Sequence, residues 1–85
     1  MQKKHYYGHR QRLRERFLEQ GLEGFQDYEA LELLLQFVAR QKDMKELAKY
    51  LVKRFGSFKN VLDASAEELQ SVDGVGPAAI TLIHL

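Results

Sequence analysis

The stretch Leu69-Gln70-Ser71-Val72-Asp73-Gly74-Val75-Gly76-Pro77-Ala78-Ala79 joins two apolar segments through a turn that contains two glycines. Because glycine has no β-carbon, the backbone can bend sharply at Gly74 and Gly76, and a ligand can approach it closely. Pro77 suits the first position of the next helix. We expect Val75 to point inward and to fix the turn. The stretch therefore predicts a hairpin of two helices.

The backbone amides at this turn are candidates for binding an anion. The first N–H groups of a helix have no partner within the helix, and they lie at the positive end of its dipole. Successive N–H groups in such a turn form a concave site that suits a phosphate oxygen. The candidate nucleic-acid-binding residues here are Gly74, Val75, Gly76, Pro77 and Ala78. A purely structural turn stays open, as does a turn whose carbonyls hold a monovalent cation.

Helical signals continue along the rest of the chain, and no stretch alternates apolar and polar residues as a half-buried strand would. The expected helices cover residues 9–20, 28–40, 44–55, 58–62, 66–72 and 77–85. The expected caps are Asp27, Asp43 with Glu46, and Ser65 with Glu68 at helix starts, and Gly21 and Gly56 at helix ends. The sequence predicts an all-α fold of five or six short helices.

Length and composition restrict the class of protein. A chain of 85 residues with 45% hydrophobic and 29% charged residues is typical of one globular domain. The absence of cysteine excludes disulfides and cysteine–zinc sites, and it fits a cytoplasmic protein. No apolar run approaches the ~20 residues that span a bilayer, and the charged N-terminus does not resemble a signal peptide. We expect no membrane contact, metal, cofactor or catalytic residues.

Charge alternates in blocks along the chain. Residues 1–16 and 40–59 each carry a net charge of +5, whereas residues 17–39 carry −5 and residues 60–85 carry −4. Within the second basic block, four lysines lie within about 80° of one another on an ideal helix, opposite its apolar face. This lysine stripe consists of Lys42, Lys45, Lys49 and Lys53. It suits contact with phosphates, and the alternative is a solvated face on which Glu46 pairs locally.

The first basic block contains an arginine cluster of Arg10, Arg12, Arg14 and Arg16. These residues cover too many faces of a helix to form a single stripe. Contact with phosphates, contact with a partner domain and plain solvation stay open for them. Whether the two basic blocks meet on one surface depends on the fold.

Several motifs resemble those of known families. The turn Gly74-Val75-Gly76, with Val72 before it and Ala79 after it, looks like a helix-hairpin-helix motif, and residues 55–76 resemble the tandem form of that motif in DNA repair proteins. The N-terminal half adds Gly8-His9-Arg10, Arg12-Leu13-Arg14 and Arg16-Phe17, followed by Asp27-Tyr28-Glu29 and Leu31-Glu32-Leu33-Leu34-Leu35. This ordered set is similar to the N-terminal domain of the RadC family of bacterial DNA repair proteins.

The resemblance implies a tandem helix-hairpin-helix bundle (SAM-like, RuvA C-terminal-like) with an extra N-terminal helix. Residues 1–26 would form the basic helix and its connector, and residues 27–85 the tandem domain. In that family a JAB/MPN metallopeptidase-like domain follows, and its metal motif is absent here. The last expected helix has no stop signal, so we expect a fragment of a longer protein.

Two functions follow as hypotheses. The first is a non-catalytic accessory domain that binds DNA through its phosphates without sequence specificity, with branched or single-stranded DNA as candidate targets. The second is a protein-interaction module that positions a C-terminal domain. The second is favoured by the lack of any basic residue after Lys59, since DNA-binding hairpins usually carry Lys or Arg just after the second glycine.

Overall fold

The computed structural model describes residues 5–39 and 43–85, and these residues form six helices with no strand. The helices are α1 (His5–Gln20), α2 (Asp27–Leu35), α3 (Lys45–Phe55), α4 (Phe58–Asp63), α5 (Ala66–Gln70) and α6 (Pro77–His84). The expected all-α fold is thereby confirmed. Its assignment as a tandem helix-hairpin-helix domain, and the boundary between residues 1–26 and 27–85, stay predictions.

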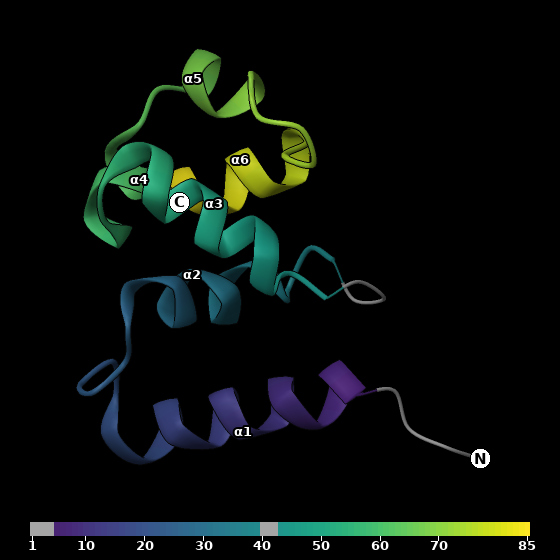
Figure 1. Cartoon of the computed structure of the whole chain (residues 1–85), viewed down its shortest axis with the longest axis vertical. Coiled ribbons are helices and arrows are strands. Elements are labelled where there is room, and N and C mark those ends of the chain that lie inside the picture. Colours follow the sequence, from purple (N-terminus) through teal and green to yellow (C-terminus); the bar gives the residue numbers. More distant parts are fainter. Residues whose placement is uncertain (1–4, 40–42) are drawn as a thin grey trace.

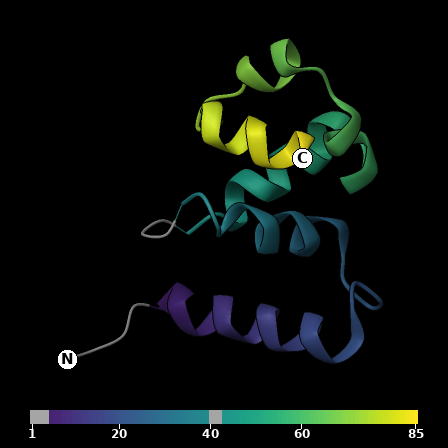
Figure 2. The same cartoon turned by 180° about the vertical axis from the view of Figure 1, so that it is seen from behind.

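The helices lie along a molecule whose longest axis is 39 Å. In Figure 1, α1 lies at one end of this axis, α2 lies beside it, and α3, α4 and α6 come next, with α5 at the far end. The view from behind shows the same order (Figure 2). Helix α2 therefore separates α1 from α3. No helix among the described residues is both long enough and apolar enough to cross a membrane.

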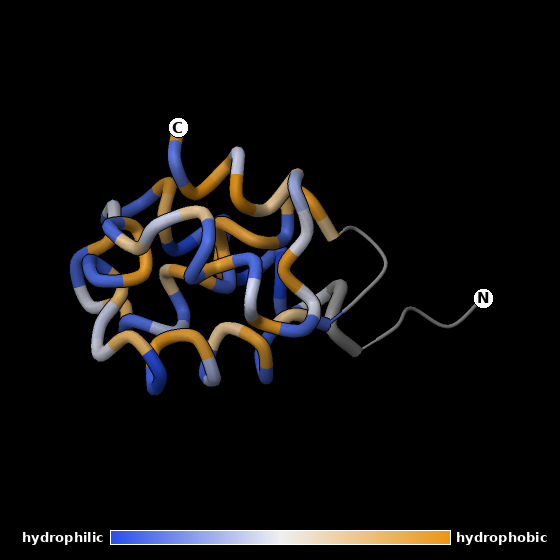
Figure 3. The backbone as a smooth tube through the Cα atoms, turned by 90° about the horizontal axis from the view of Figure 1, so that it is seen from above, coloured by the Kyte–Doolittle hydropathy of each residue, from blue (hydrophilic) through white to orange (hydrophobic). Residues whose placement is uncertain are grey.

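The main core lies between α2, α3, α4, α5 and α6. Leu31, Leu35, Leu51, Val61 and Leu69 are fully buried there. Burial of each such side chain contributes about 1.5–3 kcal/mol. Hydrophobic and hydrophilic residues alternate along the helical tube, as amphipathic helices require (Figure 3).

The glycine hairpin packs through apolar side chains, as the inward position expected for Val75 requires. The buried residues of its two helices and its turn are Leu69, Val72, Val75, Ala79 and Ile83. Val75 points inward and is 7% exposed. The hairpin is therefore anchored by its apolar side chains, and its polar backbone stays on the outside.

Most predicted caps are confirmed. Ser65 and Glu68 form a capping box at α5, and Pro77 is the first residue of α6. Gly21 and Gly56 follow α1 and α3 in the left-handed conformation, with φ of 68° and 104°. These signals depend only on neighbouring residues, so the sequence suffices to find them.

The caps predicted at Asp27 and Asp43 are wrong. The N-cap of α2 is Gln26, which forms a capping box with Glu29, and Asp27 is the first helical residue. The Asp27 carboxylate instead accepts a hydrogen bond of 3.0 Å from the backbone N–H of Phe58, at the start of α4. At α3 the N-cap is Met44, and Asp43 accepts from the N–H of Lys45 at 3.0 Å.

Three expected helices also have different limits. Helix α1 begins at His5 rather than at residue 9. Helix α2 ends at Leu35 and continues as a turn over residues 36–38, rather than reaching residue 40. Helix α5 ends at Gln70, with Ser71 as its C-cap, rather than at residue 72. Val38 and Val72 lie just beyond the observed ends and pack against the core, and such apolar residues give no local sign of where a helix stops.

Candidate nucleic-acid interface

The hairpin turn uses its two glycines differently. Gly74 has a φ of 93°, a conformation that strongly favours glycine, so the sharp bend occurs there. Gly76 is extended, with φ −102° and ψ −178°, and a β-carbon at this position would meet no atom within 4 Å. The backbone conformation therefore requires glycine at Gly74 but not at Gly76. The missing side chain at Gly76 leaves open space in front of α6.

Within the described residues, the first amides of α6 have no acceptor. Gly76 is the N-cap of this helix and has no side chain that could accept from the first amides. The first backbone hydrogen bond of the helix is donated by the N–H of Ile80 to the Gly76 carbonyl. Ala78 is exposed, and within the described part of the chain no acceptor is found for its N–H. Of the predicted turn residues, Val75 alone is buried, and its N–H donates to the Val72 carbonyl at 3.2 Å.

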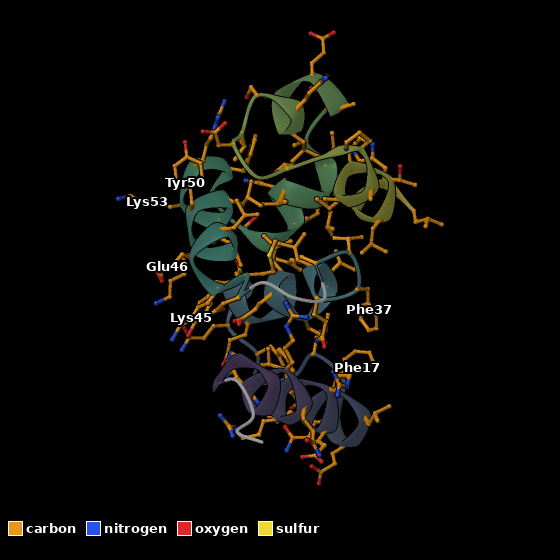
Figure 4. The ribbon with its side chains drawn as sticks, turned by 90° about the vertical axis from the view of Figure 1, so that its right-hand side faces the viewer. Phe17, Phe37, Lys45, Glu46, Tyr50 and Lys53 are labelled. Carbon is orange, nitrogen blue, oxygen red and sulfur yellow. The ribbon has the colours of Figure 1, made fainter. Side chains whose placement is uncertain are left out.

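The lysine stripe lies on the outer face of α3. Lys49 and Lys53 are exposed and Lys45 is partly exposed, whereas Lys42 lies outside the described residues. Figure 4 shows Lys45, Glu46, Tyr50 and Lys53 projecting from α3 on the same side. Within residues 5–39 and 43–85, no ion pair joins Glu46 or any other acid to these three lysines. Pairing of Glu46 with Lys45, Lys49 or Lys53 is thus not observed, and the alternative of a solvated face stays open.

Helix α3 and the hairpin form one continuous surface. Arg54 Nη2 of α3 donates a hydrogen bond to Ser71 Oγ at 3.1 Å. A β-carbon on Gly74 would lie 3.6 Å from Leu47 Cδ2. A depression of about 490 Å³ opens between the two elements, lined by Leu47, Tyr50, Ser71, Val72 and Asp73. Among the described residues, Arg54 is the basic side chain of α3 that contacts the segment leading into the hairpin, and no lysine of the stripe lines the depression.

Sequence reasoning treated the stripe and the hairpin as separate features and did not single out Leu47, Tyr50 or Arg54 as site residues. One signal was present in the sequence. Tyr50 lies off the apolar face of its helix, between Lys49 and Lys53, and an aromatic residue at such a position has no place in the core. The structure leaves 50% of Tyr50 exposed.

The arginine cluster is mostly used within the chain. Arg10 is 7% exposed and donates to the Ala39 carbonyl, and Arg14 Nη1 donates to Gln36 Oε1 at 2.7 Å. Arg16 pairs with Glu29 at 3.0 Å and lies 4.3 Å from the centroid of the Phe25 ring. Arg12 is exposed. The two basic blocks thus lie in different layers, and three arginines hold α1 to α2 and to its connector.

Buried polar groups accompany these arginines. His9 Nε2 lies 2.9 Å from Glu32 Oε2, and the Glu32 side chain is 3% exposed. The second Glu32 oxygen and the Gln36 amide nitrogen are buried without a hydrogen-bond partner among the described residues. Leu13 is the one buried apolar residue among residues 8–20 of α1. Helix α1 is therefore attached mainly through polar contacts.

The described residues contain no group of three or more histidines, aspartates or glutamates close enough together to hold a metal ion. The fold and the site define a small all-helical module with a cationic face beside a glycine hairpin. Comparison with known proteins places it more closely: residues 6–81 match the family model described as UPF0758 N-terminal. The chain belongs to the UPF0758 family, and the predicted resemblance to the RadC family is confirmed.

Two relatives show the extent of the match. The chain is 45% identical over its whole length to a UPF0758 protein of Fusobacterium nucleatum, of which it covers 37%. It is 49% identical over 73 residues, 86% of the chain, to a UPF0758 protein of Ruegeria pomeroyi, of which it covers 33%. The chain therefore spans about a third of the length of these curated relatives. No solved structure matches it.

Proposed function

We propose that this chain is a non-catalytic accessory domain that binds the phosphate backbone of DNA without sequence specificity. The observation that carries the proposal is that, among the described residues, the lysines of α3 have no acidic partner and the first amides of α6 have no acceptor. Lysines and helix N-termini both bind phosphate groups, and neither reads the sequence of bases. A cytoplasmic location and a role in DNA repair belong to the same proposal.

The hairpin would hold one phosphate, and the lysines of α3 would contact other phosphates of the same DNA. Lys45, Lys49 and Lys53 are spaced over about two turns of α3, and two turns of helix measure roughly 11 Å. Phosphates of one DNA strand are separated by several ångströms, so a helix of this length can contact two or three of them. We expect weak affinity that falls steeply with salt.

Titration of labelled duplex and forked DNA at several salt concentrations tests this function. Each lysine that contacts a phosphate contributes about −0.9 to the slope of log K against log salt. Lys49→Gln and Lys53→Gln are each expected to reduce this slope by about 1. The matched control is Lys59→Gln, because Lys59 carries the same charge but lies on α4 and pairs with Asp63 at 2.9 Å. Absence of binding at low salt would refute the proposal.

A second candidate function is supported by a different surface. Phe17, Leu18 and Phe37 are 42%, 82% and 62% exposed, and Figure 4 shows Phe17 and Phe37 on the side opposite to the labelled lysines. Exposed aromatic side chains are typical of protein interfaces. Because the relatives are about three times longer, this apolar surface suits a module that positions a C-terminal domain, as the RadC resemblance implies.

Phe37→Asp separates the two functions. In a full-length UPF0758 protein with the same residues, this change should weaken the docking of the C-terminal part and leave DNA affinity unchanged. Lys45→Glu combined with Lys49→Glu should weaken DNA binding and leave the docking of the C-terminal part unchanged. Limited proteolysis between the two parts measures the docking, and DNA titration measures the binding.

A further inference from the structure

The depression between α3 and the hairpin has the size and lining of a small ligand site. Its volume of about 490 Å³ lies within the ~300–1,000 Å³ that is typical of ligand clefts. Leu47 and Val72 provide apolar surface, and Val72 is only 4% exposed. Tyr50 forms one wall. An aromatic wall over an apolar base suits a flat, partly apolar ligand.

Basic residues lie at the rim of the depression, and an acidic residue lines its interior. Lys53 and Arg54 follow Tyr50 by three and four residues, so they lie one helical turn along the same side of α3. The Arg54 guanidinium is fixed at one end of the depression by its bond to Ser71. Asp73 is the acid that lines the depression itself. A phosphate is therefore attracted to the rim and repelled from the interior.

A nucleobase meets both requirements of this interior. Its face can stack on the Tyr50 ring, and its amino and imino groups can donate hydrogen bonds to the Asp73 carboxylate. In a duplex, both faces of each base are covered by neighbouring bases, so a tyrosine on a protein surface can stack only on an unpaired base. The phosphates on either side of such a base would then lie near Lys53 and Arg54.

We propose that Tyr50 and the depression beside it bind an unpaired nucleobase, so that single-stranded DNA is preferred over duplex. This inference rests on the proposed DNA-binding function and names its substrate class. Stacking of a base on an aromatic side chain contributes about tenfold or more to affinity. Because half of the Tyr50 side chain is exposed, its replacement should leave the core intact.

Titration of the chain with a labelled single strand of mixed sequence, and with the duplex of the same length, tests the inference. The chain should bind the single strand more tightly. Tyr50→Ala should weaken single-strand binding about tenfold and duplex binding much less, whereas Tyr50→Phe should keep the preference because the ring remains. The control is Phe37→Ala, another exposed aromatic residue on the opposite side, which should change neither affinity (Figure 4).

A second variant distinguishes a base from a phosphate in the depression. Asp73→Ala removes the acceptor, so it should weaken single-strand binding if the carboxylate accepts hydrogen bonds from a base. It should strengthen binding if a phosphate occupies the interior, and that result would overturn the inference. Equal losses on both DNA forms with Tyr50→Ala, or no loss, would also overturn it while leaving the proposed function in place. If the unaltered chain binds neither DNA, both proposals fail.

Discussion

Arg54 Nη2 donates a hydrogen bond of 3.1 Å to Ser71 Oγ, and this bond joins the last turn of α3 to the end of α5. The Ser71 hydroxyl in turn donates to the Glu68 carbonyl at 2.7 Å. The two bonds hold the lysine-bearing helix against the segment that leads into the glycine hairpin. Features that are about 20 residues apart in the sequence thereby become one surface.

The two hairpin glycines should differ when each is replaced by alanine. Gly74→Ala forces a β-carbon into a backbone with a φ of 93°, and we expect a loss of about 1–3 kcal/mol in the free energy of unfolding. Gly76→Ala meets open space at an ordinary φ, and we expect a loss below about 1 kcal/mol. Urea denaturation measures both changes.

Gly76→Ala should change the affinity for DNA more than it changes the stability of the fold. The methyl group of Gly76→Ala would lie in front of the free amides of α6, so DNA binding should weaken although the fold is kept. A Gly76→Ala chain that is stable and binds DNA normally would show that the hairpin is only a structural turn.

Asp27 should stabilise α4 although the two are 31 residues apart. Its carboxylate caps the N–H of Phe58, and removal of such a cap costs about 1 kcal/mol. Asp27→Ala is therefore expected to lower the midpoint of thermal unfolding. Asp63→Ala serves as the comparison because it removes only an exposed i,i+4 ion pair with Lys59, and its effect should be clearly smaller.

Arg10 and Arg12 should contribute unequally to stability. Arg10 is buried and donates to the Ala39 carbonyl, so Arg10→Ala should cost about 1.5–3 kcal/mol. Arg12 is exposed, and Arg12→Ala should change the free energy of unfolding by less than about 0.5 kcal/mol. Chemical denaturation followed by circular dichroism compares the two. Equal effects would show that α1 is not held to α2 in this way.

Acid should destabilise the chain partly through Glu29. The hydrogen bond from Arg16 holds the pKa of Glu29 below its ordinary value of 4.5 in the folded state. A depressed pKa stabilises the fold above pH 4.5, and this contribution is lost as the pH falls through the lowered pKa. Glu29→Gln keeps a group that can complete the capping box of α2. It should show a smaller loss of stability between neutral and acidic pH in urea denaturation.

The candidate site shows why some features could be predicted from sequence and others could not. Gly74 and Pro77 act on their own backbone, so their roles could be predicted from the neighbouring residues alone. The turn residues and the lysine stripe were identified in the same way. The contact of Arg54 with Ser71 could not be predicted, because it depends on how α3 packs against the hairpin. Tyr50 gained its candidate role only from that packing.

The sequence by itself determined the helical class, the hairpin turn and most helix ends, because periodicity and capping act over a few residues. Tertiary structure decided which charged groups are available. Arg10, Arg14 and Arg16 are engaged by acceptors beyond their own helix, whereas Lys45 and Lys53 project outward from α3 and Lys49 lies over the Tyr28 ring, 5.0 Å from its centroid. Hydrogen-bond partners are chosen by distance in space rather than along the chain, so only the fold separates the arginines that hold α1 in place from the cations that can meet a ligand.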